Sequence, residues 1–484
     1  IFFFIISLIM RYTLFTYTNI LRSCEVSVPG FFQGKIDEVV LYNKALNQSE
    51  VSYRYNNGFG KEDFNFRGKP STVFVDDDFN ASTLDWGYDH FNHIQEGINA
   101  VSENGTEYVY NGTYTEQIDV TKTVYLDGEN NTNTIIIGGF NISKDNTSIQ
   151  NFKITKGYEW PNEAGDGPQY NGENKAGVYI KSSSFCTLSS NNICEIYGGN
   201  ATNPDYEMCG GYGGIATGIY LSLASGDFYN NTINNITGGN AEFAQDIPGN
   251  GGDGMGFYLE SSACNLINNN INNISGGAGG GGALTGGNGG NGIGFYLKSS
   301  TCNLTDSSIY FISGGTGGEG YYGGGSGGFG DGIWLYSCNN TIVKQCTISN
   351  ITGGPGSDYG GWGGFCNGLY LYSCNFTTIN QCDISNITGG PGGLGSYYDG
   401  FSGFGGIGAG INLQSTSSNI INSNNISAIN GGKGGSVYGR QANPGANATG
   451  IYLQDSELTN VTSNIINFIT GGAGGSGSPN GSNG

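Results

Sequence analysis

Short stretches of alternating apolar and polar residues recur along most of the chain. One such unit, residues 332–354, reads GIWLYSCNNTIVKQCTISNITGG. Its three apolar pieces contain Ile333 and Leu335, then Ile342, then Ile348 and Ile351. Period-two alternation in short pieces predicts strands rather than helices. Three strands joined by tight polar bends predict one coil of a β-solenoid, in which each coil pairs with the next about 4.8 Å away.

Two anchors mark the repeat. The first is a glycine followed by an apolar, an aromatic and an apolar residue, and it begins at Gly177, Gly218, Gly256, Gly294, Gly332, Gly368, Gly410 and Gly450. The second, such as INNITGG from Ile233, precedes a glycine-rich excursion. The two anchors therefore predict that each repeat consists of one constant coil and one variable loop. All loops leave from the same corner, and glycine permits close backbone approach. We therefore hypothesise an ordered layer of extended, polyproline-II-like strands over the aromatic positions of the anchors.

The coil pattern, roughly GIxLxxSxxNxIxxNxIxxI, resembles the repeat of right-handed pectin-lyase-like β-helix proteins over about residues 138–472. The segment that begins VFVDDDFN at Val73 resembles the entry module of β-helix proteins on archaeal and bacterial cell surfaces. This resemblance implies a short helix that caps the open end of the solenoid. Its apolar face would contain Phe91, Ile94, Ile98 and Val101, and its N-cap would be Asp89. The predicted fold is an all-β, right-handed parallel β-helix with glycine-rich loops at one corner and an N-terminal capping helix.

The chain is expected to fall into five segments. Residues 1–28 stay unassigned. They open with IFFFIISLIM, which is too short to cross a bilayer, and a signal-peptide core and a chain fragment both remain open. Residues 29–60 resemble the C-terminal strand and helix of laminin-G/concanavalin-like jelly rolls, residues 61–72 form a linker, and residues 73–137 form the entry module. Residues 138–484 hold the repeats, and we expect the C-terminal cap to be missing because no polar end segment is visible.

The composition narrows the choice of partners. Glycine contributes 89 of 484 residues, without the every-third spacing of collagen. The net charge is −21, and after residue 176 the basic residues are only Lys181, Lys298, Lys344, Lys433 and Arg440. Nucleic acid is therefore excluded as a partner, because phosphate binding needs clustered Lys and Arg.

The middle residue of each first anchor should point outward, since its apolar neighbours point inward. These residues form an aromatic stripe, broken only by Asn412: Tyr179, Tyr220, Tyr258, Tyr296, Trp334, Tyr370 and Tyr452. One interpretation is a platform for sugar rings. The other is a structural ladder buried under the glycine loops, in which neighbouring aromatic pairs each add about 0.2–1 kcal/mol.

Cysteines recur at matching points shortly after the anchor, and those in the first of two sets each precede an Asn, so we expect their positions to be equivalent. One set contains Cys264, Cys302, Cys338 and Cys374, and a second contains Cys346 and Cys382. Equivalent positions in adjacent coils are about 5 Å apart, which suits either a buried thiol ladder or inter-coil disulfides. The spacing does not favour a metal site.

Sequons and acidic residues add further candidates. Asparagines expected to carry glycans in a secreted protein are Asn104, Asn111, Asn230, Asn339 and Asn375. Other sequons, such as those of Asn235 and Asn273, fall at coil corners, where a side-chain ladder is expected. Asp76, Asp77 and Asp78 are a weak candidate for a cation site, and a solvated strand end is the alternative. We otherwise expect no cofactor.

The repeat region shows no clustered carboxylates and no Ser/His/Asp arrangement, so the sequence predicts no catalytic residues. We expect an extracellular or cell-surface, non-catalytic structural or adhesive protein. Its expected partners are glycans or other cell-surface proteins. The alternative is a polysaccharide lyase or glycoside hydrolase of the pectin-lyase-like fold, because that fold hosts both kinds of enzyme.

Overall fold

The computed structural model of the chain describes residues 68–160, 171–202, 209–395, 401–437 and 442–477. The chain divides into two units, residues 1–68 and residues 69–484. The jelly-roll remnant expected at residues 29–60 and most of the linker lie outside the described residues.

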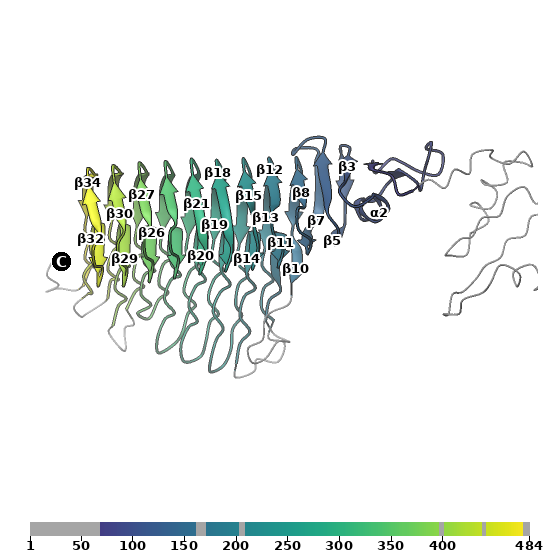
Figure 1. Cartoon of the computed structure of the whole chain (residues 1–484). Coiled ribbons are helices and arrows are strands. Elements are labelled where there is room, and N and C mark those ends of the chain that lie inside the picture. The colour runs from purple at the N-terminus through teal and green to yellow at the C-terminus, as the bar shows by residue number, and fades with distance from the viewer. Residues whose placement is uncertain (1–67, 161–170, 203–208, 396–400, 438–441, 478–484) are drawn as a thin grey trace, which may run out of the picture. The chain divides into compact units, whose positions relative to one another are not determined.

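The second unit is a stack of coils, each made of three strands (Figure 1). The strands form three sheets, here called A, B and C, and the chain visits them in the order C, A, B within each coil.

Sheet A contains β1 (Thr72–Val75), β2 (His90–Phe91), β3 (Gly105–Val109), β6 (Val124–Gly128), β8 (Ser148–Gln150), β12 (Cys186–Ser189), β15 (Ser225–Tyr229), β18 (Ala263–Ile267), β21 (Thr301–Thr305), β24 (Ile342–Lys344), β27 (Thr378–Asn380), β30 (Ile420–Asn422) and β33 (Asn460–Thr462). Sheet B contains β4 (Gly112–Tyr114), β7 (Thr134–Ile142), β9 (Lys153–Lys156), β13 (Asn192–Tyr197), β16 (Thr232–Thr237), β19 (Asn270–Ser275), β22 (Ser308–Ser313), β25 (Thr347–Thr352), β28 (Asp383–Thr388), β31 (Asn425–Asn430) and β34 (Ile465–Thr470). Sheet C contains β5 (Gln117–Val120), β10 (Tyr158–Trp160), β11 (Asn174–Lys181), β14 (Ala216–Ser222), β17 (Gly254–Glu260), β20 (Gly292–Lys298), β23 (Gly330–Tyr336), β26 (Cys366–Tyr372), β29 (Gly408–Gln414) and β32 (Ala448–Gln454), and it is joined to sheet B through β7.

Equivalent residues of successive coils lie side by side. For example, Phe257 in β17 pairs with Phe295 in β20, and Ile271 in β19 pairs with Ile309 in β22. Among the described strands only β10 and β11 pair antiparallel, and the other pairings are parallel. The predicted right-handed parallel β-helix is confirmed.

The core runs along the axis of the solenoid and is filled by Ile, Leu, Val and Phe from all three sheets. Phe257 and Phe295 are fully buried, with ring centroids 4.9 Å apart. One detail of the sequence prediction is wrong. In the middle strand of the unit at 332–354, Val343 is the buried residue, whereas Ile342 is 40% exposed. The period-two pattern does not determine which of two adjacent apolar residues points inward.

The chain turns its corners on single residues with left-handed backbone. In successive coils these include Asn230 (φ 57°) and Asn268 (φ 51°) after sheet A, and Asn235 (φ 55°) and Asn273 (φ 55°) within sheet B. Asparagine tolerates this conformation better than most residues with a side chain. The recurrence of Asn at the corners therefore has a local structural cause.

A short helix, α2 (Ile94–Ala100), lies in the entry module. Phe91, Ile94, Ile98 and Val101 are buried in the core, as the helical pattern predicts. The expected N-cap is wrong, because His93 occupies that position without a side-chain cap. The Glu116 carboxylate accepts hydrogen bonds from the backbone N–H groups of Ile94 and Gln95 instead, at 2.9 and 3.0 Å. That the helix caps the solenoid stays a prediction.

The described parts of the glycine-rich excursions form an ordered layer. Figure 1 shows the loops side by side at one end of the coils. Each loop has an outgoing strand that continues sheet B and a returning strand that leads into sheet C. In the triplet Asn288-Gly289-Gly290 of one returning strand, the three N–H groups bond in turn to Asn250 Oδ1 (2.8 Å), Ser326 O (2.9 Å) and Gly277 O (2.8 Å). Three successive donors with three different partners indicate the threefold, extended helix of polyproline-II type.

Close approach, rather than unusual backbone torsion, explains why the layer needs glycine. Of its described glycines, only Gly360 has a left-handed φ. A Cβ on Gly290 would lie 2.0 Å from the carbonyl oxygen of Gly252, and one on Gly289 would lie 2.1 Å from that of Gly315. No side chain fits between backbones at that separation.

The last described coil has partly exposed core positions. Leu453 is 43% exposed and Ile466 is 44% exposed, whereas their counterparts Leu413 and Ile426 are fully buried. Among the described residues, no helix has the length and apolar character needed to cross a membrane.

Candidate functional site

The aromatic stripe lies on the outer face of sheet C. Its members pair in register from Tyr179 to Tyr370, and Asn412 takes the next place before Tyr452. Tyr452 is 41% exposed, and the others are half-buried. Trp160 of β10 stacks on Tyr179, with ring centroids 5.7 Å apart.

The rings at the start of the stripe stack on one another. The centroids of Tyr179 and Tyr220 are 4.9 Å apart at an interplanar angle of 17°, and those of Tyr220 and Tyr258 are 4.9 Å apart at 11°. Near-parallel rings this close overlap face to face, because rings lying side by side in one plane would clash. Their faces are thus occupied, so this part of the stripe offers a sugar mainly ring edges and hydroxyl groups.

A hydrogen-bonded network crosses the stripe where Asn412 interrupts it. Tyr370 OH donates to Gln414 Oε1 (3.2 Å), and Gln414 Nε2 donates to Asn412 Oδ1 (3.4 Å). Asn412 Nδ2 then donates to Asn367 Oδ1 (3.1 Å), and Asn367 Nδ2 to Asp331 Oδ1 (2.7 Å). Asp331 is fully buried, and its Oδ2 has no protein partner. Burial raises the pKa of Asp331 to about 7, although the Asn367 amide opposes the rise.

Because the pKa of Asp331 is raised in the folded protein, we predict that the free energy of unfolding depends on pH. The folded-state pKa of Asp331 is about 7, whereas the unfolded value is about 3.9. The folded state therefore binds the proton more tightly, and stability falls as the pH rises from about 4 to about 7 and then levels off. Asp331→Asn keeps an acceptor for Asn367 and removes this contribution. We expect the variant to be more stable than the wild type at pH 8 and to lose the advantage at pH 4, as measured by urea unfolding. A stability difference that does not change with pH would contradict the assignment.

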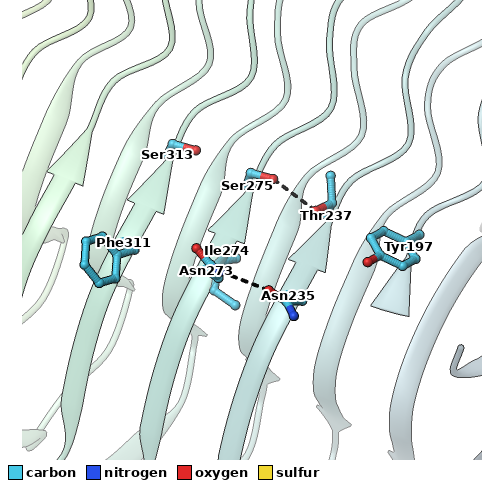
Figure 2. Close-up of a pocket in the computed structure, with 8 residues that line it drawn as sticks. All are labelled: Tyr197, Asn235, Thr237, Asn273, Ile274, Ser275, Phe311 and Ser313. Atoms are coloured by element: carbon cyan, nitrogen blue, oxygen red, sulfur yellow. Dashed lines mark hydrogen bonds between the residues drawn. The ribbon is translucent and has the colours of Figure 1, made fainter. Parts of the chain in front are cut away.

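A shallow pocket lies on the outer face of sheet B (Figure 2). It spans four successive strands, β13, β16, β19 and β22, near the point where the chain enters the glycine layer. Its lining residues are Tyr197, Asn235, Thr237, Asn273, Ile274, Ser275, Phe311 and Ser313. None of them is charged.

Hydrogen bonds between coils hold the polar residues of this pocket. Asn273 Nδ2 donates to Asn235 Oδ1 at 2.9 Å, and Ser275 Oγ bonds to Thr237 Oγ1 at 3.1 Å. Tyr197 is 54% exposed and Phe311 is 56% exposed, and they stand in the two outermost strands of the pocket. Amide and hydroxyl groups are thus held between two exposed aromatic rings. The corner ladder expected for Asn235 and Asn273 is confirmed.

Sequence reasoning missed Tyr197 and Phe311 as site residues. The available signal is a break in the repeat. Tyr197 takes a place that Thr or Ser fills in the next three coils, and Phe311 takes a place that Asn fills in the two coils before it.

The cysteines form three pairs, so the predicted alignment of four equivalent cysteines is wrong. Cys264 and Cys302 pair inside strands β18 and β21. Cys338 and Cys374 lie instead at the corner after sheet C, where Cys374 Sγ accepts the N–H of Cys338 at 3.3 Å. The distance from the anchor separates these places, because Cys264 and Cys302 lie eight residues after the anchor glycine and Cys338 and Cys374 lie six residues after it.

Cys346 and Cys382 form the third pair, at the corner between sheets A and B. The Cys382 N–H donates to Asn424 Oδ1 at 2.9 Å, so these thiols continue a ladder that other coils build from Asn. Contact with Cys382, and then burial, raises the pKa of Cys346. All six cysteines are buried, free thiols in the structure.

The carboxylates of Asp76, Asp77 and Asp78 approach within 4.8 Å of one another. Two of them bind backbone groups, since Asp76 Oδ1 accepts the N–H of Asp78 and Asp77 Oδ2 accepts that of Thr113, each at 3.0 Å. These bonds agree with the alternative of a solvated strand end, and the cation site stays a prediction.

Among the predicted glycan acceptors, Asn104, Asn111, Asn230 and Asn339 are exposed and Asn375 is half-buried. Their modification stays a prediction.

No family model matches the chain, and no curated protein does. The solved structures that it resembles include pectin methylesterase PemA from Erwinia chrysanthemi, at 12% identity, 66% of this chain, 82% of that chain and TM-score 0.26. The A-module of a mannuronan C-5 epimerase from Azotobacter vinelandii matches at 12% identity, 77% of this chain, 94% of that chain and TM-score 0.30. DFA-IIIase from Arthrobacter chlorophenolicus matches at 9% identity, 75% of this chain, 88% of that chain and TM-score 0.34.

These descriptions name enzymes, several of them acting on carbohydrates. Such distant likeness concerns the fold alone.

Proposed function

We propose that this chain binds an uncharged carbohydrate in the pocket on sheet B. The observation that carries the proposal is the pair of exposed rings, Tyr197 and Phe311, with amide and hydroxyl side chains between them. Binding sites for small ligands combine aromatic walls with a few fixed polar groups. The two rings are three inter-coil steps apart along the axis, or about 14 Å at about 4.8 Å a step. This span suits a short oligosaccharide rather than a single sugar.

The charges of the chain support an uncharged ligand. The lining residues supply no cation to pair with a carboxylate or sulfate, and the net charge of −21 repels anions. The non-catalytic, extracellular or cell-surface role expected from the sequence is retained as part of this proposal.

Removing one wall of the pocket should weaken binding. For Tyr197→Ala we expect the Kd for neutral oligosaccharides to rise about tenfold, because truncating a central aromatic contact costs more than about 1 kcal/mol. Titration calorimetry with oligosaccharides from a glycan-array screen measures this. Tyr125→Ala is the matched control, since Tyr125 is 46% exposed on sheet A. Equal losses in both variants, or no binding to any glycan, would contradict the proposal.

The second candidate is a polysaccharide-active enzyme, and Asp253 favours it. Asp253 is half-buried just before β17, and burial raises its pKa to about 6. A carboxyl group with such a pKa can donate a proton near neutral pH. It lies near Tyr296 of the aromatic stripe, whose pKa rises to about 12 through burial and then through the charge of Asp253. A product assay on the same glycan panel separates the candidates. If the wild type turns over a glycan and Asp253→Asn does not, the chain is an enzyme that uses Asp253.

A further inference from the structure

The returning strands of the glycine layer carry a side chain at every third residue. In the earlier coils these residues are Asn250, Asp253, Asn288 and Asn291. Their side-chain oxygens bond to the next coil, since Asn250 Oδ1 accepts the N–H of Asn288 and Asp253 Oδ1 accepts that of Asn291, at 2.8 and 2.7 Å. A carboxamide or carboxylate at these positions therefore stabilises the layer itself.

Of the six equivalent positions in the next three coils, five are apolar and the sixth is Ser326. Phe329, Trp362, Phe365, Phe404 and Ile407, here called the aromatic patch, are 38%, 54%, 42%, 44% and 42% exposed. The N–H of Phe329 still bonds to Asn291 Oδ1 at 2.8 Å, but a phenyl or indole ring offers no such acceptor to the coil that follows. In the coil after Ile407 the position is Asn447 again. The aromatic residues thus replace a hydrogen bond of the layer by contacts between exposed rings, and large apolar side chains exposed at positions that are otherwise polar indicate a binding surface.

The patch lies on a fixed support. The rings of Phe329 and Phe365 are parallel within 2°, with centroids 5.6 Å apart, and Trp362 meets Phe404 edge to face at 5.7 Å. Beneath them the backbones are hydrogen-bonded, for example from Gly363 N to Phe404 O and from Cys366 N to Ile407 O, at 2.8 and 2.9 Å. Residues three apart in such a strand share one side, so Trp362 and Phe365 face the same way. A preorganised aromatic surface loses little conformational entropy when it binds.

We propose that the aromatic patch is a second binding surface, which contacts the apolar face of an uncharged polysaccharide. Its five residues carry no charge, so an anionic glycan gains no ion pair there. A second copy of the chain is the main competing occupant, but each copy carries a net charge of −21, which opposes self-association. The patch lies on the returning strands of the loops and the pocket on sheet B, so either can fail without the other.

The test is binding of the full chain to particles of cellulose and of chitin, with soluble polygalacturonate as an anionic competitor. We expect Trp362→Ala combined with Phe404→Ala to weaken binding to at least one neutral polysaccharide about tenfold. Two single variants are the controls: Tyr125→Ala, because Tyr125 is 46% exposed in β6 of sheet A, and Phe185→Ala, because Phe185 is 73% exposed at the corner before β12. Both should bind the particles within about twofold of the wild type.

Four outcomes would overturn the proposal: no particle binding, equal losses in the controls, polygalacturonate competing as well as neutral fragments, or undiminished binding by the double variant. Light scattering on the same samples tests the competing occupant. If the wild type is an oligomer and the double variant is a monomer, the patch is a contact surface for a second copy of the chain. Matching melting temperatures exclude misfolding, and Phe365→Ala alone provides an independent reading if the double variant is unstable. Titration with soluble oligosaccharides reports the pocket separately.

Discussion

Gly290→Ala should lower the free energy of unfolding by about 3 kcal/mol or more, at or above the upper end of ordinary overpacking. The added Cβ would lie 2.0 Å from the Gly252 carbonyl oxygen and 2.5 Å from its carbon, and neither backbone atom can rotate away. Gly290 also donates to Gly277 O and accepts from Gly315 N, each at 2.8 Å. Moving the strand to relieve the clash would strain hydrogen bonds on both sides. Urea unfolding of the full chain, followed by circular dichroism, measures the loss.

A second glycine of the same layer supplies the control. At Gly323 the nearest atom to an added Cβ is Thr285 Cγ2 at 3.9 Å, which is ordinary contact. Gly323→Ala should therefore change stability by no more than about 0.5 kcal/mol. Similar effects of the two substitutions would show that the layer is not closely packed in solution.

Phe295→Ala should cost about 3–5 kcal/mol, the range for removing a large buried aromatic side chain. Phe295 is fully buried, and its ring stacks on Phe257 with centroids 4.9 Å apart. In a solenoid each coil contacts only its neighbours, so the damage should be local. Hydrogen exchange should accelerate first in β17, β20 and β23.

Phe401→Ala is the matched control, because Phe401 is 75% exposed and its loss should be close to neutral. Uniform acceleration of exchange along all described coils in Phe295→Ala would contradict local opening and indicate a single cooperative unit.

The fold could be predicted from the sequence because the same strand pattern follows the first anchor in eight successive repeats. Alternating residues such as Ile333 and Leu335 define a strand, and the return of the pattern after about 38 residues defines a coil. Where two apolar residues are adjacent, as at Ile342 and Val343, the pattern could not predict which of them points into the core. The alignment of Cys264 with Cys338 failed for a different reason: each cysteine precedes an Asn, but the two lie eight and six residues after their anchor glycines and so occupy different places in the coil.

The candidate sites were less predictable than the fold. The aromatic stripe follows from alternation alone, and its register is as expected. The pocket instead depends on Tyr197 and Phe311, which lie 114 residues apart in the sequence and share a surface only because four successive coils stack in register. The buried carboxyl of Asp331 resembles any scattered acid in the sequence, because its pKa depends on the burial that the surrounding coils impose.

The close packing of the glycine layer constrains how such a chain can change over generations. Each inner glycine is bounded by carbonyl groups of neighbouring coils, so one coil cannot accept a larger residue there unless its neighbours move as well. Point mutation is thereby restricted to the third positions and the loop tips, where Gly323 has room. A whole coil with its loop can be copied or deleted without creating a clash, because every coil presents the same backbone to the next. Gain and loss of entire repeats is therefore the expected route by which this array lengthens and shortens, and new binding surfaces should arise by substitution at third positions such as Trp362.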